Sequence, residues 1–143
     1  MLNSSNRESR LTTTEKLLTT ALRHKIKVDR FPMPIVREVA MEYAGKSFVN
    51  VDPSVSSRDL VYYLAHGIGH IIRGELSNPY SPYDNTGKHE RRADEWAIQK
   101  VFSKSKIKKA IRTGCTEPWQ IAEEFGTSVE FATKALNFYK GTN

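Results

Sequence analysis

The histidines at positions 66 and 70 are the residues whose type and spacing point most directly to chemistry. They stand four residues apart in an amphipathic stretch that predicts a helix. On a helix this spacing places the two side chains about 6 Å apart along the axis and about 40° apart around it. Both rings can then direct a nitrogen at one ion, since Zn–N distances are about 2.0–2.1 Å. A lone histidine would more simply decorate a polar helix face, but this pair favours a metal site.

Two carboxylates, Glu90 and Asp94, fall on the apolar face of the next predicted helix. The other residues of that face are Ala93, Trp96, Ala97, Ile98 and Val101. An unpaired buried charge is costly and normally has a partner or a metal. Glu90 can therefore supply a third protein ligand and leave a fourth position to water, as in catalytic zinc sites. Asp94, one turn later, is placed to accept a hydrogen bond from a ligand histidine and fix its tautomer.

Other interpretations of this second helix stay open. Glu90 and Asp94 could instead form salt bridges with a buried arginine or lysine. His89 could take the place of Glu90 as a ligand, although it projects toward the edge of the helix. We expect the metal ligands to be His66, His70 and Glu90.

The pattern along the chain predicts an α+β fold that positions these residues. Its elements are a helix over 14–25, a strand over 26–31, an extended stretch over 36–51 with a hairpin turn at 44–46, a helix from 56 or 57 to 73, a loop over 77–88, a helix over 88–103 and three short helical segments. A helix, then a small sheet, then further helices is typical of this class. We expect the last two segments to form a helical hairpin.

Composition limits the kind of protein. The 143 residues suit one domain, and 38% hydrophobic with 27% charged residues is ordinary for a globular protein. No apolar run reaches the roughly 20 residues that span a bilayer, and the polar N-terminus does not look like a signal peptide. The single cysteine, Cys115, excludes an internal disulfide and suits a reducing compartment. We therefore expect a cytoplasmic protein without contact to a membrane.

Two segments together resemble the ImmA/IrrE family of metallo-endopeptidases, which are gluzincin-type HExxH zinc peptidases. They are LAHGIGH at 64–70 and ERRADEWA at 90–97. The family typically shows A-H-E-[IL]-G-H and then E-x-x-A-[ND]-x-F-A. Similar stretches precede and follow them, so the resemblance covers most of residues 30–140. It implies a zincin-like metallopeptidase domain over 13–143, with a flexible N-terminus at 1–12 and a helical C-terminal subregion at 104–143.

The resemblance also implies a function. It makes His66, His70 and Glu90 the ligands of Zn²⁺. It implies a bacterial or prophage hydrolase that cleaves a helix-turn-helix transcriptional repressor and so acts as an anti-repressor. We expect that repressor to bind between His66 and the loop at 77–88.

One position departs from the family pattern. The general base of HExxH should follow the first histidine, but Gly67 stands there. General acid–base catalysis is typically worth about 10²–10⁴-fold, so hydrolysis should be impaired although metal binding need not be. Glu75 lies beyond the helix end and Glu95 faces away, so neither replaces the base. We expect Gly67→Glu to add hydrolysis, to leave zinc content unchanged and to stabilise the helix slightly.

Two further functions compete with an impaired peptidase. One is a zinc-binding pseudo-enzyme that regulates a repressor by binding alone. The other is a helix-turn-helix DNA-binding protein, because residues 117–139 have the rhythm of that motif around Gly126. The second helix of the motif offers Lys134 and Asn137 but no arginine, and a recognition helix normally shows more base-reading side chains. Direct nucleic-acid binding is therefore the less favoured interpretation, despite a net charge of +6.

Overall fold

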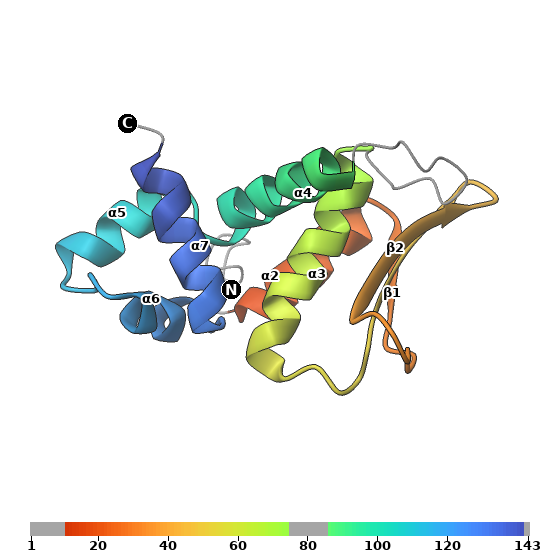
Figure 1. Cartoon of the computed structure of the whole chain (residues 1–143), viewed down its shortest axis with the longest axis horizontal. Coiled ribbons are helices and arrows are strands. Elements are labelled where there is room, and N and C mark those ends of the chain that lie inside the picture. Colours follow the sequence, from red (N-terminus) through yellow and green to blue (C-terminus); the bar gives the residue numbers. More distant parts are fainter. Residues whose placement is uncertain (1–10, 75–85, 142–143) are drawn as a thin grey trace, which may run out of the picture.

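A computed structural model describes residues 11–74 and 86–141 of the chain (Figure 1). Its elements are α2 (Thr13–Arg23), β1 (Ile26–Asp29), β2 (Glu38–Tyr43), β3 (Lys46–Val51), α3 (Ser57–Ile72), α4 (Thr86–Val101), α5 (Lys104–Arg112), α6 (Pro118–Phe125) and α7 (Val129–Lys140). This succession of helix, three-stranded sheet and helices confirms the predicted α+β class. None of the helices in the described ranges is long and apolar enough to cross a membrane.

The sheet is mixed, with the strand order β1-β3-β2. β1 runs parallel to β3, and β2 runs antiparallel to β3. The predicted hairpin turn is confirmed at Ala44 and Gly45, whose φ angles are 52° and 75°. Two positive φ angles are what a tight two-residue hairpin needs if it is to follow the twist of its strands. The strands are shorter than predicted, because β1 ends at Asp29 and β2 begins only at Glu38.

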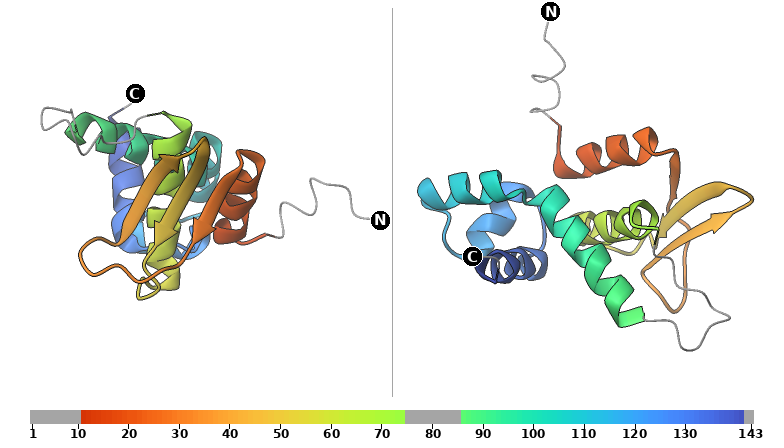
Figure 2. Two further views of the ribbon diagram at one scale, coloured as in Figure 1. Left: turned by 90° about the vertical axis from the view of Figure 1, so that its right-hand side faces the viewer. Right: turned by 90° about the horizontal axis from the view of Figure 1, so that it is seen from above.

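Helix α3 lies between the sheet and α4 (Figure 1). Viewed through the sheet, it runs behind the strands (Figure 2). Its start is fixed by Ser56, whose hydroxyl accepts a hydrogen bond from the Asp59 N–H at 3.2 Å, as an N-cap residue does. The buried side chains of α3 toward the core are Val61, Leu64, Ala65 and Ile68. They belong to one core cluster with Val49 and Val51 of β3.

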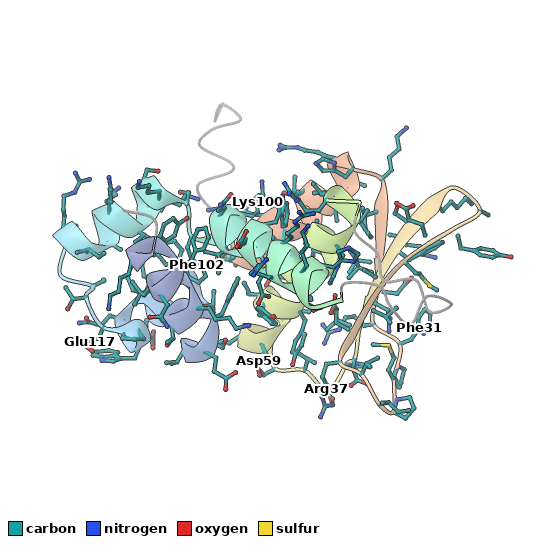
Figure 3. The ribbon with its side chains drawn as sticks, turned by 45° about the horizontal axis from the view of Figure 1, so that its top comes forward. Phe31, Arg37, Asp59, Lys100, Phe102 and Glu117 are labelled. Carbon is teal, nitrogen blue, oxygen red and sulfur yellow. The ribbon has the colours of Figure 1, made fainter. Side chains whose placement is uncertain are left out.

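The C-terminal helices pack on the far side of α4 from the sheet. Helices α6 and α7 form the predicted hairpin around Gly126, which ends α6 with a φ of 68°. Phe102, labelled in Figure 3 where α4 gives way to these helices, has its ring centroid 4.9 Å from those of Phe125 and Phe131. The apolar face of the hairpin is therefore buried against the rest of the chain.

Some predictions fall wholly or partly outside the described residues. The flexible N-terminus at 1–12 is described only at its last two residues, and most of the predicted loop at 77–88 is not described. The following helix begins at Thr86, two residues earlier than predicted, and ends at Val101 rather than 103.

Candidate metal centre

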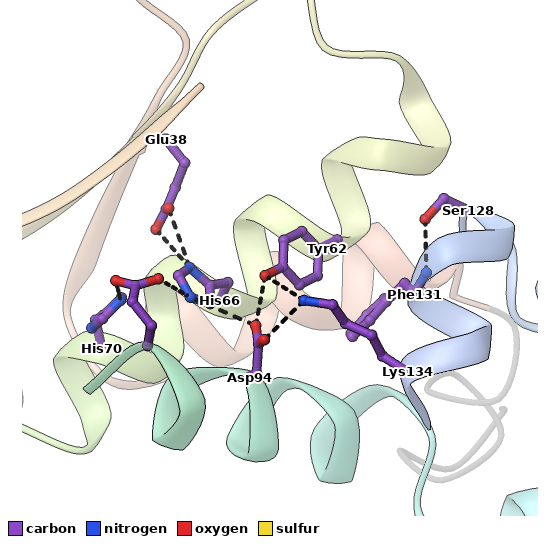
Figure 4. Close-up of polar contacts among 9 residues, drawn as sticks. Glu38, Tyr62, His66, His70, Asp94, Ser128, Phe131 and Lys134 are labelled. Atoms are coloured by element: carbon purple, nitrogen blue, oxygen red, sulfur yellow. Dashed lines mark hydrogen bonds and ion pairs between the residues drawn. The ribbon is translucent and has the colours of Figure 1, made fainter. Parts of the chain in front are cut away.

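The structure brings together the three residues predicted as metal ligands. Glu90 Oε2 lies 2.8 Å from His66 Nε2, and Glu90 Oε1 lies 2.9 Å from His70 Nε2. One ligand atom from each residue lies within 4.8 Å of the others. The two rings meet edge to face, with centroids 4.6 Å apart (Figure 4). His89, the alternative ligand, is not part of this cluster.

The close approach of α3 and α4 depends on Gly69, between the two histidines. A β-carbon added at position 69 would lie 3.0 Å from the backbone oxygen of Ala93 and 3.1 Å from Trp96 Cε3. Both contacts are tighter than ordinary van der Waals separations between heavy atoms. The glycine therefore lets α4 lie against α3, and this brings Glu90 to the histidines.

Glu38 is a site residue that the sequence analysis missed. It begins β2, and its carboxylate oxygens lie 3.2 Å and 3.4 Å from Nδ1 of His66. Its side chain is only 11% exposed. The signal in the sequence was the period of two along a strand, which puts Glu38 on the same face as Ala40. Ala40 packs against the core cluster, so Glu38 also points toward α3.

Asp94 does not make the hydrogen bond that we expected. It lies 3.6 Å from His66 Nε2, which is too long for one. Its Oδ1 instead accepts a hydrogen bond from the Tyr62 hydroxyl at 2.6 Å, and its Oδ2 accepts one from Lys134 Nζ at 2.9 Å. Asp94 therefore forms a salt bridge to a lysine, although Lys134 is 48% exposed and is not the buried partner of the alternative interpretation (Figure 4). The sequence could not show this, because Lys134 reaches the site from α7.

The hydrogen bonds of His66 bear on whether these residues fit a metal ion. If Nδ1–H donates to Glu38, a lone pair on Nε2 faces the carboxylate of Glu90. Nε2 is buried and, although close to Glu90, is not in hydrogen-bond geometry. Two electron-rich atoms in such contact require a cation between them, either a metal ion or a proton. A donor set of two imidazoles and one carboxylate suits a metal ion well.

The charges around the histidines agree with this fit. In the described part of the chain, His66 contacts the carboxylates of Glu38, Glu90 and Asp94, and Asp94 also contacts Lys134. Burial on its own lowers the pKa of His66, but these three carboxylates raise it more, so its pKa lies above the usual value. A divalent cation at this point would be attracted by the same carboxylates.

Gly67 lies against the sheet, and this bears on an expectation. A β-carbon at position 67 would lie 2.7 Å from Val49 Cγ1 and 2.9 Å from Glu38 Oε1. Val49 is fully buried. These contacts argue against the expectation that Gly67→Glu would stabilise the helix slightly and leave zinc content unchanged. Helix propensity alone suggested it, and the packing of α3 on β3 opposes that propensity.

Comparison with known proteins agrees with this geometry. A family model described as the IrrE N-terminal-like domain, of a peptidase family, matches residues 21–137. The match includes β1 to β3, α3 with both histidines and α4 with Glu90. No curated protein matches the chain. Since the match covers well over half of the sequence, the chain belongs to the IrrE N-terminal-like peptidase family.

Proposed function

We propose that this protein is a zinc-binding member of its family that binds a helix-turn-helix repressor and cuts it very slowly or not at all. The proposal rests on two features together. Three potential zinc ligands lie close to one another, and Gly67 stands where the family pattern has the general-base glutamate. His66, His70 and Glu90 converge on one point. Gly67 beside them has no side chain, and a β-carbon there would force Val49 or Glu38 to shift.

Zinc is the metal that this donor set suits best. Two histidines and one carboxylate, with a fourth position for water, is an arrangement of catalytic zinc sites. Bound there, the ion would polarise a carbonyl group and acidify its water. His66 and His70 would hold it through their Nε2 atoms, and Glu90 would hold it through a carboxylate oxygen.

Peptide hydrolysis also needs a group that takes a proton from water and returns one to the leaving amine. Gly67 offers none. Of the nearby carboxylates, Glu38 contacts the Nδ1 side of His66, and Asp94 is bound to Tyr62 and Lys134. Loss of general acid–base catalysis should lower the rate by about 10²–10⁴-fold.

The choice of a repressor as the partner rests on the ImmA/IrrE resemblance. The net charge of +6 also suits an acidic protein partner. The proposed role is an anti-repressor of phage or mobile-element type in the cytoplasm, which relieves repression by holding the repressor. DNA binding by α6 and α7 is not favoured, because Lys134 pairs with Asp94 and Phe131 is buried.

The test combines metal analysis with a binding and cleavage assay. We expect about one zinc per purified chain, lost in His70→Ala and Glu90→Ala but kept in His24→Ala, which changes an exposed histidine at the end of α2. The repressor encoded nearby should be captured by the wild-type chain and stay intact in a long timed digest. A chain that carries no zinc, or that cuts the repressor quickly, would contradict the proposal.

A further inference from the structure

Glu38 and a side chain at position 67 compete for the same volume. The Glu38 Oε1 atom lies 2.9 Å from where a β-carbon at 67 would be. Real β-carbons essentially never approach a heavy atom so closely. The carboxylate of Glu38 can therefore keep its present position only because residue 67 is glycine.

The position of Glu38 is well defined. Its backbone pairs with Val51 at the end of the hairpin, which places it beside α3. Its side chain is nearly buried, and both oxygens lie within 3.4 Å of a single ring nitrogen, His66 Nδ1. A buried carboxylate is costly unless it is paired and hydrogen-bonded, and His66 provides that pairing.

We infer that Glu38 is the positioning residue that orients His66 for metal binding, and that Gly67 is what makes room for it. A histidine that binds metal through one nitrogen commonly donates the proton of the other to a carboxylate, which fixes the tautomer and the ring orientation. Glu38 acts on Nδ1, so Nε2 is left to face His70 and Glu90. This inference rests on the metal site of the proposed function and adds a residue from a different element, β2.

Position 67 thus affects both the general base and the orientation of His66. Because Gly67 has no side chain, the site lacks the general-base glutamate. For the same reason, the carboxylate of Glu38 has room to reach His66. The site therefore lacks a carboxylate placed for proton transfer and holds one placed to orient a ligand. Metal binding without efficient hydrolysis is the expected outcome of that arrangement.

The first experiment measures zinc affinity of the full chain by competition with a chromophoric chelator at fixed pH. We expect Glu38→Ala to weaken zinc binding by about 10–100-fold, as for other partners of ligand histidines. Glu38→Gln should stay much closer to the wild type, because its amide oxygen still accepts the Nδ1 proton. Glu42→Ala is the matched control, because Glu42 lies on the same strand, is exposed and contacts Ser47. The zinc affinity of this variant should equal that of the wild type.

A double-mutant cycle tests the link to position 67. Gly67→Ala should weaken zinc binding because its β-carbon displaces the Glu38 carboxylate. In a Glu38→Ala background the same change should add little, since the contact is already lost. Circular dichroism with a chelator present reports whether each variant is folded, and Glu38→Gln keeps the inference testable if Gly67→Ala does not fold.

A spectroscopic measurement separates positioning from general stability. In zinc-loaded, ¹⁵N-labelled protein, the His66 Nδ1 proton should be protected from exchange in the wild type and in Glu38→Gln, and exposed in Glu38→Ala. Equal zinc affinity in the wild type and Glu38→Ala would overturn this inference alone. So would a loss in Glu38→Gln as large as that in Glu38→Ala. A wild-type chain that binds no zinc would refute the proposed function together with it.

Discussion

Replacing Gly67 by glutamate is the perturbation that most directly tests how the site is packed. The new β-carbon would start 2.7 Å from Val49 Cγ1, whereas carbon atoms prefer about 3.5–4.0 Å. Overpacking of this kind typically costs about 1–3 kcal/mol. The better helix propensity of glutamate returns about 1 kcal/mol. We therefore expect a net loss of stability of up to about 2 kcal/mol, and weaker zinc binding because Glu38 is displaced.

The assay is thermal unfolding with a chelator present, so that packing is measured apart from metal binding. For a chain of this size 1 kcal/mol corresponds to roughly 2–4 °C, so Gly67→Glu should lower the midpoint by up to about 8 °C. Gly141→Glu is the matched control, because a β-carbon there meets only ordinary contacts of 3.6 and 3.7 Å. Should Gly67→Glu be more stable than the wild type and bind zinc equally well, our account of position 67 would be wrong.

Three further changes test other parts of the site and the fold. Gly69→Ala should separate α4 from α3 and weaken zinc binding, which chelator competition will show; an affinity equal to the wild type would contradict our account of helix packing. In the double variant His70→Ala/Glu90→Ala, added zinc should raise the unfolding midpoint much less than in the wild type. With a chelator present, the variant should still be folded. Hydrogen bonds from the Ser54 hydroxyl and from nearby backbone N–H groups lower the pKa of Asp52 from 3.8 to about 2. Its contribution to stability is thus complete above pH 3.8 and is lost as the pH falls through about 2, and acid titration of Asp52→Asn should lack this component.

The sequence predicted the elements well where local signals were strong. Period and capping placed α3 within a residue, and the turn at Ala44 and Gly45 marked the hairpin. The three residues of the candidate cluster could also be picked out from local patterns, although Glu90 is 48% exposed and not buried as its place on an apolar face had suggested. Such patterns depend only on residues within a few turns of each other.

The contacts that link distant elements could not be predicted in this way. Glu38 lies 28 residues before His66, and Lys134 lies 40 residues after Asp94. Whether two such residues meet is decided by the register of β2 and by the packing of α7. The same reason applies to Gly67, whose neighbour Val49 belongs to another element.

Lys134 connects α7 to the candidate metal centre. Its ammonium group pairs with Asp94 and lies 4.9 Å from the centre of the Tyr62 ring. Without α7, Asp94 would keep its bond to Tyr62 but lose the positive charge that offsets one of three carboxylates. The subregion at 104–143 therefore contributes a charged residue next to the candidate site. The family match is consistent with this, because it extends through α5 and α6 and past Lys134 to residue 137.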